Sequence, residues 1–209
     1  MQTTIRGIRG GGSGEEVTIK ATRAGSLHVA QMLPPGALLT AQGNSWTAIT
    51  TSAVPVDVDE PNTTALFTLY NGESGGGKSY VIDRIFAYQD ISGTNESRWA
   101  LWAIVQDVGT TPVAQDISLI NSLRGVTNYG GNARLGVGDS VVNTGWSPWG
   151  RSVDVEPTST LGGSAVSVDV KGRMVVPPTA ACSLFVVAST ADEDCVVGFH
   201  WHEVQLDLN

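Results

Sequence analysis

The pattern in this sequence that most suggests chemistry is a glycine-rich segment ending in lysine and serine. Residues Gly72–Ser79 read GESGGGKS and match the phosphate-binding loop of nucleotide hydrolases position for position. In that loop the glycines expose backbone N–H groups, the lysine contacts the phosphates and the serine binds magnesium. A nucleotide hydrolase is therefore one hypothesis for this chain.

The residues around this segment favour a different interpretation. A phosphate-binding loop lies between a strand and a helix, because the helix N-terminus supplies much of the attraction for the anion. Ala65–Tyr70 predicts the strand, but Tyr80–Tyr88 is rich in β-branched and aromatic residues, which favour another strand. We therefore expect Gly72–Ser79 to be a glycine hairpin with Lys78 as a solvated side chain. We expect no catalytic residues and no cofactor.

Two histidines form the next candidate site. His200 and His202 are two residues apart, so on a strand they share one face, whereas Glu203 lies on the other face. His28 is the only other histidine. Because zinc sites need three or four ligands, we expect a pair of histidines on a sheet face and no metal site.

Three acidic residues, Asp57, Asp59 and Glu60, lie close together in the sequence. Calcium needs six to eight oxygen ligands, and no loop of suitable spacing surrounds these residues. They are more typical of the charged, solvent-exposed face of an edge strand.

The six tryptophans suggest a possible sugar-binding surface. Trp146 and Trp149 lie in a glycine-rich stretch and are the only two that we consider for a ligand. The other four lie in predicted strands, where we expect core or subunit contacts. These are Trp46, Trp99, Trp102 and Trp201.

The elements that position these residues are predicted by a two-residue alternation of apolar and polar side chains, which is typical of strands. Val166, Val168 and Val170 alternate with polar residues, and glycine and proline turns separate many such runs. This pattern predicts an all-β, antiparallel β-sandwich that is jelly-roll-like. Ala114–Leu123 is the one helical possibility. The other strand candidates are Val17–Ala21, Leu27–Met32, Val54–Val58, Trp99–Gln106, Leu184–Ala188 and Val196–Leu206.

The 25 glycines are spread along the chain, so no boundary between domains is visible. We expect a flexible, glycine-rich N-terminal arm over residues 1–14, because Gly7–Gly14 has few side chains that can pack. A single β-sandwich domain is expected over residues 15–209. Within it, the Gly- and Asn-rich stretch 121–150 is interpreted as a long loop.

The low charge content limits the possible partners. The chain has 12 Lys and Arg against 20 Asp and Glu, a net charge of −8, so direct binding to nucleic acid is not expected. No apolar run is long enough for a transmembrane helix, and the first residues contain no secretory signal. Only 15% of the residues are charged, below the usual share on a monomer surface, so we expect other chains to cover part of this surface.

The two cysteines, Cys182 and Cys195, flank an apparent hairpin with its turn near Ala191–Glu193. Pairing about that turn places them roughly 20 Å apart, too far for a disulfide. We therefore expect two free, buried thiols.

Several segments of the first 90 residues resemble small structural proteins of tailed bacteriophages. The segments are Ile8–Gly11, Ala24–Leu27, Leu69–Gly72 and Gly76–Ile82. In the similar proteins the last two link a pair of strands and hold no nucleotide. The resemblance implies a jelly-roll-like virion component, such as a capsid decoration protein or a head- or connector-associated protein.

This resemblance implies a virion structural protein, assembled in the host cytoplasm, and we expect that it is not an enzyme. Its expected partners are copies of itself, with a trimer favoured, and the major capsid protein or other head proteins. A carbohydrate- or receptor-binding β-sandwich module is the alternative from another class. The nucleotide hydrolase is the third.

Overall fold

The computed structural model describes residues 5–8, 16–19, 36–91, 98–107, 120–125, 129–141, 145–152, 165–191 and 193–206. The chain divides into two units, Met1–Ala37 and Leu38–Asn209. In the first unit, β1 (Ile5–Ile8) pairs antiparallel with β2 (Glu16–Ile19). The rest of the predicted N-terminal arm, and the strand candidate Leu27–Met32, lie outside the described residues.

The second unit is almost entirely β-structure. Within the described residues, no helix has the length and apolar character needed to cross a bilayer. The elements are α1 (Ala37–Ala41), β3 (Ser45–Ile49), β4 (Val54–Pro55), β5 (Phe67–Asn71), β6 (Ser79–Ile91), β7 (Ala100–Asp107), β8 (Ile120–Ser122), β9 (Ala133–Val137), β10 (Ser147–Arg151), β11 (Ala165–Val176), β12 (Ala180–Val187) and β13 (Asp194–Val204).

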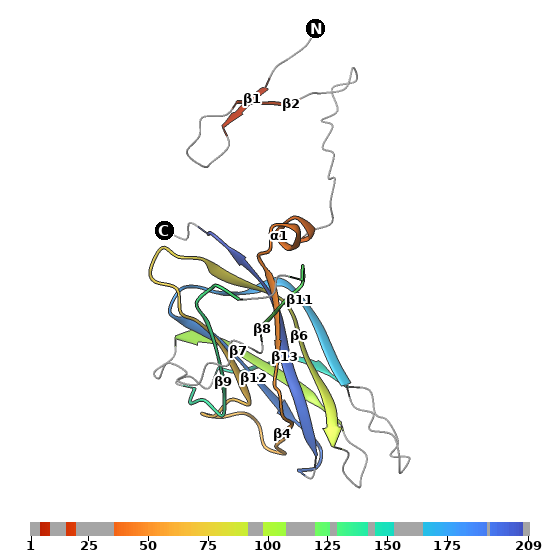
Figure 1. The fold of residues 1–209 in the computed structure, drawn as a ribbon. Coiled ribbons are helices and arrows are strands. Elements are labelled where there is room, and N and C mark those ends of the chain that lie inside the picture. The colour runs from red at the N-terminus through yellow and green to blue at the C-terminus, as the bar shows by residue number, and fades with distance from the viewer. Residues whose placement is uncertain are drawn as a thin grey trace. The chain divides into compact units, whose positions relative to one another are not determined.

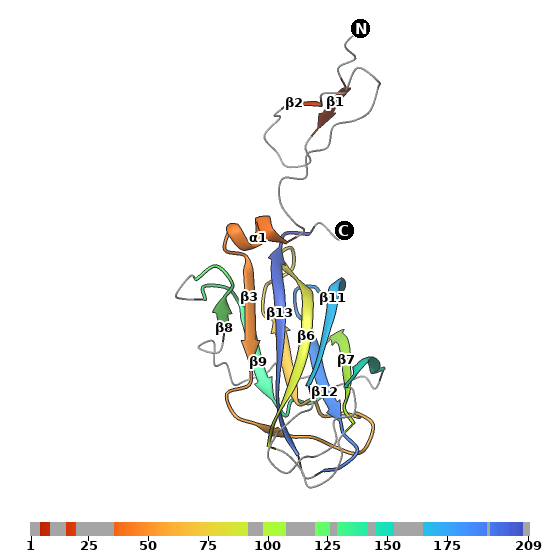
Figure 2. The same ribbon diagram turned by 90° about the vertical axis from the view of Figure 1, so that its right-hand side faces the viewer.

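These strands form two antiparallel sheets that pack face to face (Figure 1). The larger sheet has the order β11-β6-β13-β3-β8, with the short β4 beside β13, and Figure 2 shows it face on. The other sheet has the order β10-β7-β12-β5-β9. The chain crosses from one sheet to the other several times.

The strand order is that of a jelly roll. When β4, β8 and β9 are set aside, eight of the strands described in the second unit remain and can be numbered one to eight along the chain. One sheet then contains strands 1-8-3-6 and the other strands 2-7-4-5, which is the arrangement of two interlocked Greek keys. The predicted all-β, jelly-roll-like sandwich is confirmed.

The core lies between the two sheets and follows the predicted alternation. On β13, Val197, Phe199 and Trp201 are fully buried, whereas His200 is half-buried on the opposite face. Full burial of such a side chain stabilises the fold by about 1.5–3 kcal/mol. A second, smaller apolar cluster covers the outer face of the five-stranded sheet, where Phe185 of β12 packs.

The stretch 121–150, interpreted as a loop, contains two strands instead. Ala133 and Leu135 of β9 are buried, and β9 pairs with β5. The glycines around β9 hide its short alternation in the sequence. β10 is an edge strand with a bulge between Pro148 and Gly150, which is where proline and glycine are tolerated in a sheet.

The helix considered for Ala114–Leu123 is also wrong for the described residues of this range. Ile120–Ser122 forms β8 and pairs with Trp46–Ala48 of β3. An edge position in the larger sheet satisfies the backbone groups of these residues in strand form. The preceding residues, 114–119, lie outside the described part of the chain.

The two cysteines are free and buried, as predicted, but the hairpin used in that argument does not exist. Cys182 belongs to β12 in the five-stranded sheet and Cys195 to β13 in the six-stranded sheet, so the connection between them crosses the sandwich. Burial raises the pKa of each thiol to about 12. Both thiols are therefore protonated at neutral pH.

Gly198 on β13 provides a test of this packing. A Cβ atom at this position would collide with the Ala48 carbonyl oxygen and the Phe86 ring. We predict that Gly198→Ala lowers the free energy of unfolding by about 1–3 kcal/mol, measured by urea denaturation. A Cβ at Gly75 has open space around it, so Gly75→Ala is the matched control and should stay within about 0.5 kcal/mol of wild type. Equal midpoints for the two variants would contradict the described register.

Candidate functional site

The glycine-rich segment Gly72–Ser79 connects the two sheets. It leaves β5 in the five-stranded sheet and enters β6 in the six-stranded sheet, so it joins two strands as expected but is not a hairpin. Where a phosphate-binding loop continues into a helix, this chain continues into the 13-residue strand β6. Ser79 is buried in that strand, opposite Val204 of β13.

Asn71, the last residue of β5, fixes the shape of the segment that follows it. Its buried Nδ2 donates hydrogen bonds to the carbonyl oxygens of Lys78 (2.9 Å) and Val176 (3.0 Å), and its Oδ1 accepts one from the Glu73 backbone N–H (3.1 Å). Gly76 takes φ +80°, which favours glycine. Asn71 therefore determines where the Lys78 side chain starts.

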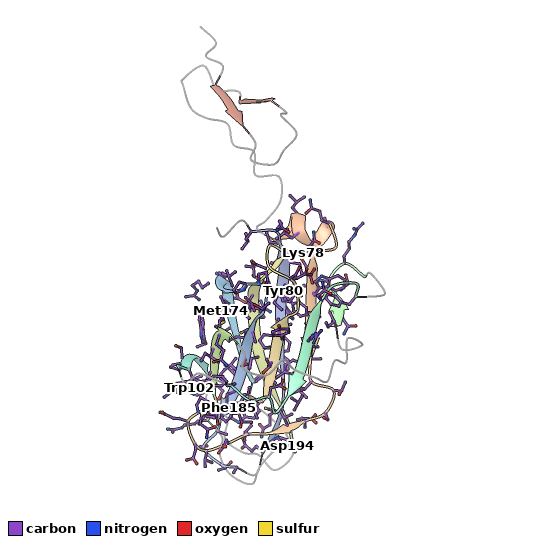
Figure 3. All side chains as sticks on the ribbon, turned by 90° about the vertical axis from the view of Figure 1, so that its left-hand side faces the viewer. Lys78, Tyr80, Trp102, Met174, Phe185 and Asp194 are labelled. Atoms are coloured by element: carbon purple, nitrogen blue, oxygen red, sulfur yellow. The ribbon has the colours of Figure 1, made fainter. Side chains whose placement is uncertain are left out.

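Lys78 contacts a buried carboxylate. Its Nζ lies 3.1 Å from Oε2 of Glu203, whose side chain is 3% exposed, while that of Lys78 is 42% exposed. The expectation of a simply solvated Lys78 is wrong. The strand β13 ends beside this segment, and the alternation of its side chains places Glu203 on the face opposite the histidines, where it meets Lys78. Figure 3 shows Lys78 near α1, at the opposite end of the sandwich from Asp194.

Two tyrosines complete the polar cluster. The Tyr129 hydroxyl donates to Oε1 of Glu203 at 2.5 Å and lies 3.4 Å from the Tyr80 hydroxyl. It also accepts a hydrogen bond from the Ala133 backbone N–H at 3.0 Å. Burial, with the negative charge of Glu203 adding to it, raises the pKa of both tyrosines, so both hydroxyls stay neutral donors.

Sequence reasoning missed Tyr129 because it lies in the stretch taken for a loop. The available signal was a tyrosine followed by two glycines. A Cβ at Gly131 would collide with the Tyr129 hydroxyl and lie 2.9 Å from Oε1 of Glu203, so only glycine fits there. Gly130 has open space around its would-be Cβ.

A surface hollow of about 290 Å³ lies over this cluster. We call it the Glu203 hollow. Charged, amide and aromatic side chains meet there from β3 and its connection to α1, the Gly72–Ser79 segment, the end of β13 and the turn after β8. Its walls include Asn44, Trp46, Lys78, Arg124, Gly130 and Glu203.

Comparison of the chain with protein-family models, curated proteins and solved structures gave no match. The interpretation of the hollow and of the other candidate residues therefore depends on their geometry.

The two histidines lie on the outer face of the six-stranded sheet, as expected. His200 packs against Phe86 with 5.1 Å between ring centroids, and Nδ1 of His202 lies 2.7 Å from Oγ of Ser45. Among the described residues, no group of three or more His, Cys, Asp or Glu is arranged to hold a metal ion. Burial lowers the pKa of both histidines, and the positive charge of Arg84 lowers that of His200 further.

The acidic residues near β4 lie in a connection between strands. Asp57 Oδ1 accepts hydrogen bonds from the backbone N–H groups of Val58 (2.7 Å) and Asp59 (3.1 Å), which closes a turn. The strand itself ends at Pro55, so the expected edge-strand face is wrong for these residues. They are exposed, together with Glu60.

The two tryptophans considered for a ligand have protein partners. Trp146 is 8% exposed, packs on Phe185 at 6.0 Å and donates to the Asn62 carbonyl oxygen at 2.8 Å. The guanidinium of Arg173 lies 5.3 Å from the centre of the Trp149 ring. Of the other four, Trp102 is half-buried on the outer face of its sheet. The core contains Trp46, Trp99 and Trp201.

A second hollow, of about 440 Å³, lies beside Trp99 and includes Arg98 and Arg151 in its walls. The Trp99 indole donates to Oε2 of the buried Glu193 at 2.6 Å. None of the residues that we singled out as catalytic, metal-binding or ligand-binding candidates from sequence lines this hollow.

The Lys78–Glu203 pair can be tested by a double-mutant cycle. Removing the ammonium leaves a buried carboxylate without its cation, so we predict that Lys78→Met destabilises the fold by about 1–2 kcal/mol in urea denaturation. In the double variant Lys78→Met/Glu203→Gln the unpaired charge is gone, so part of this loss should return. Strictly additive effects of the two substitutions would show that the side chains do not interact.

The histidine pKa shifts predict a pH dependence of stability. Because the folded state binds protons less readily than the unfolded state, whose histidine pKa is near 6.5, stability falls as the pH drops below that value. We predict that His200→Gln reduces this fall, measured by urea denaturation at about pH 7.5 and pH 5.5. Asp83, Arg84 and His202 remain around the site in both proteins. An unchanged fall in the variant would contradict the assignment.

Proposed function

We propose that this chain is a structural protein of a tailed-phage virion, a capsid decoration or head- or connector-associated protein, and not an enzyme. It works by binding copies of itself and other head proteins. The observation that carries the proposal is the outer face of the six-stranded sheet, which combines aromatic side chains with few charges.

An aromatic row crosses this face from β6 to β13. Tyr88, which is 41% exposed, lies 5.2 Å from Phe86, and Phe86 lies 5.1 Å from His200 between ring centroids. The described strands on either side, visible in Figure 2, place small or aliphatic residues on the same face. By register and alternation these include Thr47, Ile49, Val81, Val175 and Val196.

Two of the charges on this face neutralise each other. Arg84 of β6 pairs with Asp169 of β11 at 2.8 Å, and both side chains are about half exposed. Burying this pair against another chain leaves neither charge without a partner, and an unpaired buried charge is costly. Aromatic residues are enriched in interfaces for the complementary reason, because they bury much apolar area.

The N-terminal unit supplies a second argument. An isolated two-stranded sheet is marginally stable in water. Here β1 and β2 form such a pair, with Ile5 opposite Ile19 and Gly7 opposite Val17. An arm of this kind can order on a neighbouring subunit, with its ordering entropy offset at assembly.

The jelly-roll order and the resemblance to phage structural proteins agree with this proposal. Jelly rolls are common in capsid chains, because their sheet faces and loops are free to contact neighbours. A trimer is the smallest closed ring of head-to-tail contacts, in which this face of each subunit packs against a different surface of the next. The virion location is tested by mass spectrometry of purified phage particles, which must contain this chain.

The self-assembly is tested by light scattering after size-exclusion chromatography. We predict a trimer for the full chain at micromolar concentration. Tyr88→Lys, which introduces a charge into the aromatic row, should shift it towards monomer. Val137→Lys is the matched control, since Val137 is 58% exposed but lies on β9 of the other sheet. Removal of residues 1–36 should weaken assembly while leaving the sandwich folded. A monomeric wild-type chain would contradict the proposal.

A further inference from the structure

We propose that the Glu203 hollow binds a single sugar residue that carries a carboxylate. This inference goes beyond the assembly function and does not depend on it. The hollow lies at the end of the sandwich, whereas the proposed assembly face is the outer side of the six-stranded sheet.

The size of the hollow favours a small ligand. At about 290 Å³ it lies at the lower end of the range for small-molecule sites. It therefore suits one ring-sized molecule better than an extended chain or a nucleotide with its phosphates.

The charges in the hollow favour an anionic group. Two cations, Lys78 and Arg124, line it together with one carboxylate, Glu203, so its lining carries one excess positive charge although the protein as a whole has a net charge of −8. The Lys78 ammonium has three N–H donors, of which Glu203 takes one. The planar guanidinium of Arg124 has the geometry that pairs with a carboxylate through two parallel hydrogen bonds.

The uncharged polar groups favour hydroxyls on the rest of the ligand. The amides of Gln42 and Asn44 line the hollow, and each can donate and accept. Trp46 also lines it and is 6% exposed. The two amides therefore suit a ligand that carries several hydroxyl groups.

Contacts within the protein already hold the side chains at one wall of the hollow in place. Tyr129 holds Glu203 from one side and Lys78 holds it from the other, while Asn71 fixes the segment that carries Lys78. Gly131 lies so close to this pair that no other residue fits. A preorganised wall of this kind lowers the entropy lost on binding.

The experiment is saturation-transfer NMR with four probes, namely D-glucuronate, N-acetylneuraminate, D-glucose and acetate. We expect the two acidic sugars to bind to the wild-type chain, with glucose about tenfold weaker because it lacks the charge-assisted hydrogen bonds. Acetate should bind more weakly than either acidic sugar because it lacks the hydroxyls. Equal binding of glucuronate and glucose would overturn the assignment of the carboxylate, and no binding of any sugar would overturn the site.

Two variants localise the binding. Arg124→Gln should weaken glucuronate binding about tenfold while leaving glucose unchanged. Gly130→Leu should abolish binding of all the sugars, because Gly130 lines the hollow and a Cβ added there meets no atom within 4 Å.

The matched controls are Arg151→Gln, at the second hollow, and Gly75→Leu, whose Cβ also has open space. Both should bind glucuronate like wild type. Circular dichroism confirms that each variant is folded. Full binding to Gly130→Leu would overturn the proposal, because the ligand would then lie elsewhere.

Discussion

The alternation of strand β13 is the constraint on which most of this structure depends. β13 is hydrogen-bonded to β6 along its whole length and to β3 on its other side, so its residues cannot change face without breaking both ladders. One set of its side chains fills the core around Phe199 and Trp201, and the other forms the histidine-bearing outer face. The same alternation carries Glu203 to the inner side at the strand's end, where it meets Lys78. The register of β13 therefore determines the core, the outer face of the six-stranded sheet and the Glu203 hollow together.

The fold class was predictable from the sequence because strand alternation is a local signal. Val166–Val170 and the β-branched run after Lys78 indicate strands without any knowledge of their partners. Which sheet each strand joins is a non-local property. The sequence therefore suggested hairpins between β5 and β6 and between β12 and β13, whereas both connections cross the sandwich. Short strands interrupted by glycine, such as β9, carry too few residues for an alternation to be recognised.

The candidate site was only partly predictable for the same reason. Lys78 and Glu203 were each noticed in the sequence, one for a nucleotide motif and the other beside two histidines, but 125 residues separate them. Only the jelly-roll topology brings the ends of β5, β6 and β13 together. Tyr129, from the chain segment between β7 and β10, lies beside them. The segment that resembles a phosphate-binding loop is followed by strand β6, so it has no helix N-terminus to attract a phosphate. Its Lys78 pairs with the Glu203 carboxylate of the protein instead.

The segment between β7 and β10 also supplies an edge strand to each sheet. It adds β8 beside β3 and β9 beside β5, so each sheet gains one strand at the same side of the sandwich. These new edges are only three and five residues long, and a short edge is a poor template for a strand from another molecule. At the opposite side, β11 is irregular where Lys171 and Gly172 adopt positive φ, which interrupts the ladder that a foreign strand would need. Both sides of the sandwich are therefore poor starting points for open-ended, amyloid-like growth by strand addition.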